Sequence, residues 1–201
     1  VSIHAFLKSA REVGGDLYDF FIRSGRLHFI IADVSGKGMP AAMIMAVTTS
    51  MFRALQRRDI APDRTVNALN NMLLERGSAD MFVTLIVGDL NLATGELSIC
   101  NAGHTPPILV QDGKEEYLQL HRNLPIGIFQ NYHYKVNKLT LTPASRLLLY
   151  TDGVTEAVNV ADDLFGEERL LAATRKYGAK EVEPFINSMV NDTSSFTGDT
   201  P

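Results

Sequence analysis

The chain has 201 residues, of which 45% are hydrophobic and 21% are charged, the composition of an ordinary globular protein. Its formal net charge of −4 and the lack of any run of Lys or Arg argue against nucleic acid as a partner. The only cysteine, Cys100, excludes an internal disulfide, and no apolar stretch in the sequence is long enough to span a membrane. We therefore expect one domain over residues 1–201 and a cytoplasmic location.

The first part of the chain predicts a hairpin followed by two helices. Residues 17–23 and 27–34 have the pattern of strands joined at Ser24-Gly25, a two-residue hairpin turn. A helix is predicted over residues 39–58, and a second over residues 62–76 with Gly77 as its stop. The apolar stripe of the first helix, which we expect to face the core, consists of Met43, Ile44, Val47, Met51 and Leu55.

The second part of the chain predicts a run of strands and then two more helices. Hairpin turns are expected at Ala93-Thr94-Gly95 and at Asp112-Gly113. Strands that precede helices, rather than alternating with them, are typical of antiparallel sheets with helices outside, so we predict an α+β fold. The predicted strands are residues 82–91, 96–101, 107–111, 116–120, 134–141 and 146–150, and the predicted helices are residues 167–177 and 180–191.

Three short acidic motifs are candidates for a functional site. They are Val13-Gly14-Gly15-Asp16, Ala32-Asp33-Val34-Ser35-Gly36-Lys37-Gly38 and Tyr150-Thr151-Asp152-Gly153, and in the last two an apolar strand-like run ends at an aspartate and a glycine turn. A carboxylate in that position lies at the mouth of a core on rigid backbone, and the glycines allow a ligand to approach closely. Converging aspartates with almost no histidine or cysteine nearby suit a hard cation such as Mg²⁺ or Mn²⁺, and not zinc.

These motifs, together with three others in the same order, resemble the metal-dependent protein phosphatase (PPM) family, in its bacterial branch of stage II sporulation protein E and the stress-response phosphatases. The resemblance runs from about Arg11 to the C-terminus. It implies the fold of that family, a four-layer α/β/β/α sandwich in which two antiparallel sheets are flanked by helices. The other matching segments are Asn101-Ala102-Gly103-His104-Thr105-Pro106-Pro107, Asp152-Gly153-Val154-Thr155-Glu156-Ala157 and Phe165-Gly166.

The resemblance implies a catalytic site with two Mn²⁺ or Mg²⁺ ions. Asp33 would bridge both ions with the backbone carbonyl of Val34 as a further ligand, Asp152 would bind the first ion, and Asp16 would bind the second directly or through water. Taken alone, Asp33 and Asp152 would more simply start a turn or cap a helix, and the two glycines before Asp16 would mark only a bulge. Their joint occurrence favours the metal site. Asp19 is interpreted as structural, because strand alternation turns it away from Asp16.

Two basic residues are candidates for binding a substrate phosphate. Arg11 lies five positions before Asp16, near the point where the wider family has a phosphate-clamping arginine, and a guanidinium suits that role. The alternative for Arg11 is a solvated surface residue. Lys37 stands in the glycine loop beside Asp33 and either reaches the phosphate or only keeps the loop polar. His104 is interpreted as a structural residue of a turn between strands.

The function implied by the resemblance is that of a serine/threonine phosphoprotein phosphatase, in which a metal-activated water attacks the phosphate. The implied substrate is a small phosphorylated regulatory protein, such as an anti-sigma-factor antagonist in stress-response or sporulation signalling. The alternative is a non-catalytic phosphatase-like module that binds a partner. A homodimer through an open sheet edge is also possible.

One motif of the family has no counterpart in this sequence. Family members end with Asp-Asp-x-Thr on a last strand, and one of those aspartates binds the first metal. This chain ends at Thr197-Gly198-Asp199-Thr200-Pro201, where Asp199 does not match that ligand, and it begins at Val1 rather than Met. The sequence therefore predicts an excised piece of a longer protein that lacks one ligand and binds metal weakly.

Overall fold

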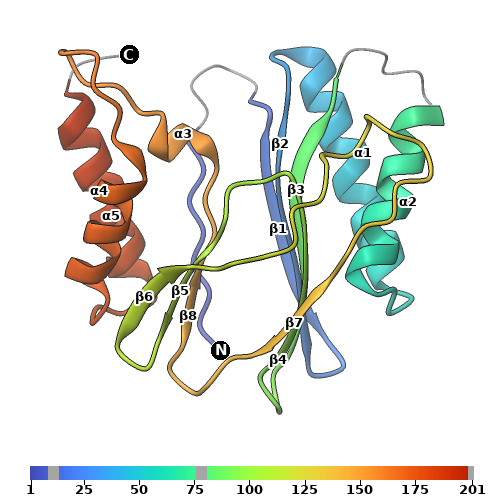
Figure 1. Ribbon diagram of the computed structural model, residues 1–201, viewed down its shortest axis with the longest axis horizontal. Helices are drawn as coiled ribbons and strands as arrows, with labels where there is room; N and C mark the ends of the chain where they lie inside the picture. Colours follow the sequence, from blue (N-terminus) through green and yellow to red (C-terminus); the bar gives the residue numbers. More distant parts are fainter. Residues whose placement is uncertain (9–13, 76–80, 199–201) are drawn as a thin grey trace. The chain divides into compact units, whose positions relative to one another are not determined.

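In the computed structural model, which describes residues 1–8, 14–75 and 81–198, the chain falls into two compact units (Figure 1). The larger unit consists of Ser9–Pro106 and Gln119–Pro143, and the smaller unit of Val1–Lys8, Pro107–Leu118 and Ala144–Pro201. Each unit has a separate cluster of buried apolar side chains. Both sheets are antiparallel and both units carry helices, so the α+β class is confirmed.

The larger unit is built on a five-stranded sheet in the order β1-β2-β3-β4-β7. The predicted hairpin is confirmed: Ser24 and Gly25 both have a positive φ, as a tight two-residue turn requires. Its strands are β1 (Asp16–Arg23), β2 (Arg26–Val34), β3 (Val83–Asn91), β4 (Glu96–Ala102) and β7 (Asn137–Thr140).

Two helices, α1 (Met39–Gln56) and α2 (Pro62–Glu75), pack beside each other against one face of this sheet (Figure 1). The side chains that α1 buries are Ala41, Ile44, Met45, Thr48, Phe52 and Gln56. The predicted apolar stripe is confirmed at Ile44, which is buried, and at Met51, which is half-buried and packs against the core. It is wrong at Met43, which is 64% exposed, while Val47 and Leu55 are only half-buried. Because α1 is apolar around most of its circumference, its periodicity indicates a helix but does not select the buried face.

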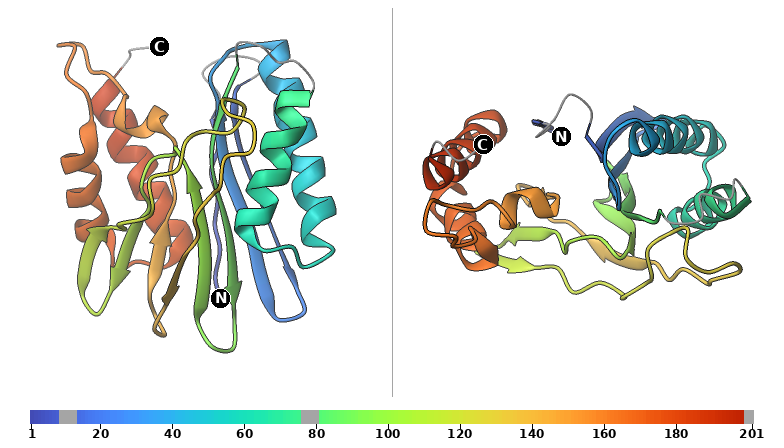
Figure 2. Two further views of the ribbon diagram at one scale, coloured as in Figure 1. Left: turned by 45° about the vertical axis from the view of Figure 1, so that its right-hand side comes forward. Right: turned by 90° about the horizontal axis from the view of Figure 1, so that it is seen from above.

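The smaller unit contains a three-stranded sheet in the order β6-β5-β8, with helices α4 and α5 packed against each other beside it (Figure 2). Its core joins side chains of β5 and β8 to side chains of both long helices, among them Ile108, Leu148, Leu170 and Phe185. The elements are β5 (Ile108–Gln111), β6 (Lys114–Tyr117), β8 (Arg146–Leu148), α3 (Asp152–Thr155), α4 (Gly166–Tyr177) and α5 (Val182–Thr197).

The predicted boundaries differ from the structure at several elements; β8, for example, ends at Leu148 rather than at residue 150. Three of the differences have a structural cause. Strand β6 begins at Lys114 because the Asp112-Gly113 turn pairs Gln111 directly with Lys114. Helix α5 continues to Thr197, because Phe196 in its polar last turns packs edge-to-face on Phe165. Residues 134–136 are not part of β7: the hydroxyl of Tyr134 donates to the Pro125 carbonyl, and the loop rather than the sheet holds this segment.

Among the described residues, no helix has both the length and the apolar character needed to cross a membrane.

Candidate functional site

On one face of the larger sheet, the side chains change from apolar to polar at one end of the strands. Asp16 on β1 pairs directly with Asp33 on β2, and Asp33 pairs with Thr84 on β3, so three polar side chains form one row across three strands. The next rows on the same face are apolar. They are Tyr18–Ile31–Ile86, Phe20–Phe29–Gly88 and Ile22–Leu27–Leu90.

The close packing of the apolar rows is visible at Gly88. A Cβ atom at Gly88 would lie 2.0 Å from the Phe29 ring, so the ring lies directly over the glycine and would have to move for any larger residue. The polar row is therefore a local change at the end of an otherwise apolar sheet face. We define Asp16, Asp33 and Thr84 as the polar row.

Two members of the polar row are carboxylates placed directly opposite each other. Residues paired across antiparallel strands have Cβ atoms about 4.5–5.5 Å apart, and like charges in that arrangement repel. Both Asp16 and Asp33 are half-buried, which weakens screening by water. A divalent cation held by both side chains would turn this repulsion into attraction, and oxygen ligands on rigid strands suit Mg²⁺ or Mn²⁺.

Gly15 opens a small space that is surrounded by oxygen atoms. A Cβ atom at Gly15 would lie 3.1 Å from the carbonyl oxygen of Val34 and 3.3 Å from both Asp33 Oδ1 and the carbonyl oxygen of Gly36. Three oxygens thus converge beside Asp16, and glycine leaves the space between them open. We call this arrangement the oxygen cradle. It fits a hard cation, and it contains two of the predicted ligands, Asp33 and the Val34 carbonyl.

The loop after Asp33 is held in place by backbone contacts. The Ser35 amide donates to the Phe82 carbonyl at 2.9 Å, and the Phe82 amide donates to Ser35 Oγ at 2.8 Å. The Val34 amide donates to the Gly15 carbonyl at 3.2 Å, which ties the two acidic motifs together. Lys37 is exposed in this loop, where its side chain can turn toward a bound anion or toward solvent.

The remaining predicted site residues are not members of the polar row. Asp152, in the smaller unit, is exposed and is the first residue of the one-turn helix α3, a helix that the sequence analysis did not predict. Its backbone carbonyl accepts from the Glu156 amide at 2.7 Å. Arg11 and Asp199 lie outside the described residues.

Asp19 has a structural partner, as predicted. Its two carboxylate oxygens accept from Nε and Nη2 of Arg53 at 2.6 Å each, so the side chain faces α1. This bidentate pair connects β1 to α1 on the opposite face of the sheet from Asp16. Strand alternation correctly separated these two aspartates.

Two residues of this region were not identified as functional from the sequence. Thr84 belongs to the polar row, and His104 Nδ1 lies 2.9 Å from Thr84 Oγ1. A threonine inside a predicted strand is unremarkable, because threonine favours strands anyway. Only the register between β2 and β3 places Thr84 opposite Asp33, and that register is known from the structure.

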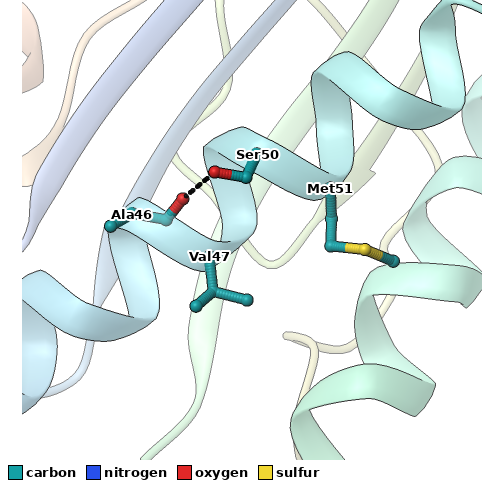
Figure 3. Close-up of a pocket in the computed structure, with 4 residues that line it drawn as sticks. All are labelled: Ala46, Val47, Ser50 and Met51. Carbon is teal, nitrogen blue, oxygen red and sulfur yellow. Dashed lines mark hydrogen bonds between the residues drawn. The ribbon is translucent and has the colours of Figure 1, made fainter.

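Other parts of the described chain do not offer an alternative centre. Burial raises the pKa of the Cys100 thiol to about 12, so it is not a thiolate nucleophile at neutral pH. A shallow hollow on the outer face of α1 is lined by Ala46, Val47, Ser50 and Met51 (Figure 3). Its one polar side chain, Ser50, donates to the Ala46 carbonyl at 2.8 Å and is already committed to the helix.

Across residues 1–8, 14–75 and 81–198, no three side chains of the His, Cys, Asp and Glu types gather as a metal-binding group. The candidate centre is a carboxylate pair with backbone carbonyls. Mg²⁺ commonly binds through one or two carboxylates and keeps several waters, with substrate phosphate completing its shell. The residues present in the larger unit therefore fit such an ion.

Comparison with known proteins gives the family. The sequence profile of stage II sporulation protein E (SpoIIE) matches residues 23–201. The chain is 30% identical over 157 residues to the phosphoserine phosphatase RsbU of Bacillus subtilis, covering 78% of this chain and 47% of RsbU. The chain thus spans less than half the length of that curated relative.

Two solved structures have a similar fold. The RsbU and RsbW domains of a Mycobacterium tuberculosis protein give a TM-score of 0.82 at 24% identity, over 95% of this chain and 53% of that one. RsbX in complex with magnesium gives a TM-score of 0.68 at 19% identity, over 95% of this chain and 84% of that one. The profile covers both units of the structure. The chain belongs to the SpoIIE family of PP2C-type phosphatases.

Proposed function

We propose that this chain is a metal-dependent phosphatase that removes phosphate from phosphoserine or phosphothreonine of a regulatory protein. The observation that carries the proposal is the pair of opposed carboxylates, Asp16 and Asp33, beside the oxygen cradle at Gly15. Membership of the SpoIIE family and the similarity to a phosphoserine phosphatase support the reaction. The profile match across both units supports one phosphatase domain over residues 1–201.

In this proposal each acidic residue has a defined task. Asp33 and the Val34 carbonyl would be the central ligands of the metal ions, Asp16 would supply the second carboxylate, and Asp152 would be a further ligand by its place in the family motif. When bound, two Mg²⁺ or Mn²⁺ ions would supply the positive charge that attracts the phosphate and would make a water acidic enough to attack at neutral pH. Lys37 is exposed in the loop that follows Asp33. In this proposal its side chain meets the phosphate or the leaving group.

The rigidity of the polar row contributes to the reaction. Asp16 and Asp33 lie on paired strands, so their separation is set by the sheet rather than by mobile loops. Substrate needs only to bring its phosphate to a preformed site, which lowers the entropic cost of reaching the transition state. No covalent intermediate on the protein is required.

For the substrate, we propose a small phosphorylated protein of the anti-sigma-factor antagonist type, which acts in the cytoplasm in stress-response or sporulation signalling. The support for this is the family of the chain and the phosphoserine specificity named for RsbU. Arg11 remains the candidate phosphate clamp by its place in the sequence.

The proposal is tested by hydrolysis of a phosphoserine peptide. We expect the purified protein with its natural C-terminus to release inorganic phosphate with added Mn²⁺ or Mg²⁺ and to lose this activity in excess chelator, with recovery when metal is restored. Hydrolysis that continues at an undiminished rate in chelator would disprove the metal mechanism. Binding of the phosphopeptide without turnover under any metal would favour the non-catalytic module.

A further inference from the structure

The third member of the polar row, Thr84, is a candidate for holding the Asp33 side chain in place. Thr84 is the direct cross-strand partner of Asp33 and its side chain lies on the same face of the sheet. At the separation usual for such partners, about 4.5–5.5 Å between Cβ atoms, a threonine hydroxyl can reach a carboxylate oxygen. The hydroxyl has one hydrogen to donate and two lone pairs to accept with.

The group to which the Thr84 hydroxyl donates depends on which ring nitrogen of His104 carries the proton. Nδ1 of His104 lies 2.9 Å from Thr84 Oγ1. If Nδ1 carries the ring proton, the imidazole donates to Thr84, and the hydroxyl hydrogen is then available for the Asp33 carboxylate. If Nδ1 is the bare nitrogen, the hydroxyl donates to the ring instead, and its hydrogen points away from Asp33.

The surroundings of His104 fix its backbone. The side chain of Asn101 contacts both backbone groups of His104, accepting from its amide at 2.8 Å and donating to its carbonyl at 3.0 Å. Asn123 in turn donates to the Asn101 carbonyl at 2.9 Å. His104 is only 8% exposed. Two buried asparagine side chains thus fix the backbone that carries the imidazole next to Thr84.

We propose that His104 is a positioning residue which, through the hydroxyl of Thr84, orients the carboxylate of Asp33 for metal binding. The inference rests on the proposed function, because it assigns a task at the same site. Nδ1–H of His104 donates to Thr84 Oγ1, and the Thr84 hydroxyl donates to Asp33. A ligand carboxylate fixed by such an outer partner binds its ion in one geometry, and loss of outer partners typically costs about 10–100-fold in metal affinity.

Four single variants and one double variant test the chain of contacts. Thr84→Val and His104→Leu each remove one link, and each should weaken Mn²⁺ binding by about tenfold and lower kcat without changing the KM for the peptide. Thr84→Ser keeps the hydroxyl, and His104→Asn keeps an N–H near the Nδ1 position, so both should retain wild-type affinity. The double variant Thr84→Val/His104→Leu should be no weaker than Thr84→Val alone, because both changes break the same link.

The ring tautomer gives a second readout that needs neither metal nor folded variants. In ¹⁵N NMR of the wild-type protein, His104 should show a protonated Nδ1 and a bare Nε2. The opposite tautomer would overturn the inference, as would normal Mn²⁺ affinity in Thr84→Val or full additivity in the double variant. A wild-type protein without metal-dependent hydrolysis would count against the proposed function. Wild-type hydrolysis with an unaffected Thr84→Val variant would contradict the positioning role alone.

Discussion

Asp33 and Asp152 follow almost the same sequence pattern but have different structural settings. Each ends an apolar run and is followed within a few residues by glycine. Asp33 remains inside β2, half-buried, with a direct partner on each neighbouring strand. Asp152 lies beyond the end of β8, exposed, at the start of a single helical turn. One carboxylate is held by a sheet, and the other by a short helix.

The difference shows what a strand contributes to a site. Pairing on both sides determines where Asp33 lies and which residues stand beside it, and this is why Asp16, Thr84 and the Val34 carbonyl can be assigned to one location. At Asp152 the local contacts are those of a helical turn, with the Thr155 hydroxyl donating to its backbone carbonyl at 3.2 Å. We therefore expect substitution of Asp33 to lower kcat/KM more than substitution of Asp152.

The largest expected effect is the loss of activity in Asp33→Asn. This change keeps the size of the side chain but removes the negative charge that is proposed to bind both ions. The two ions contribute several kcal/mol of transition-state stabilisation. Loss of their binding should therefore lower kcat/KM on the order of a thousandfold. Asp152→Asn removes a ligand of one ion only and should lose less. Steady-state kinetics on the phosphoserine peptide at saturating Mn²⁺ compares the two. A greater loss in Asp152→Asn would reverse the ranking.

Asp19→Asn is the matched control for these variants. It removes a carboxylate from the same strand as Asp16, but from the opposite face, where the partner is Arg53 on α1. We expect near-normal kcat/KM together with a folded protein, since an ion pair with a half-exposed arginine contributes modestly to stability.

A smaller effect is expected from filling the oxygen cradle. Gly15→Ala places a methyl group 3.1 Å from the Val34 carbonyl oxygen and 3.3 Å from Asp33 Oδ1 without changing any charge. The oxygens must then move apart, and Mn²⁺ affinity should fall on the order of tenfold. Gly153→Ala is the control beside Asp152, because its Cβ would meet only Thr151 Oγ1, at 3.8 Å. Equal affinities in the two variants would mean that the cradle is not a ligand site.

Much of the fold could be predicted because local patterns agreed with the tertiary structure. The turn at Ser24-Gly25 determines the register of β1 and β2, and that register alone places Asp16 opposite Asp33. The buried face of α1 could not be predicted, because its exposed side carries Met39 and Met43 and looks as apolar as its core side. Helix α3 was missed because a single turn has no periodicity to detect.

The candidate site was predictable only where a motif contained the residue. Asp16, Asp33 and Val34 were selected from glycine-rich acidic motifs, and the structure brings them together at the end of one sheet face. Thr84 comes from a strand about fifty residues later and lies in the row only through the pairing of β2 with β3. Strand pairing over that separation cannot be read from local sequence. The contact between Thr84 and His104 could not be predicted either, because it also joins residues that are distant in the sequence.

The most direct test of the central claim is a calorimetric titration of the protein with Mn²⁺. If Asp16 and Asp33 form a cation site with the oxygen cradle, the wild-type protein and Asp19→Asn should bind Mn²⁺ with the same affinity, and Asp33→Asn should bind at least about tenfold more weakly, because the number of charged ligands determines affinity for hard cations. Unchanged Mn²⁺ affinity in Asp33→Asn would contradict the assignment of the polar row as the metal site.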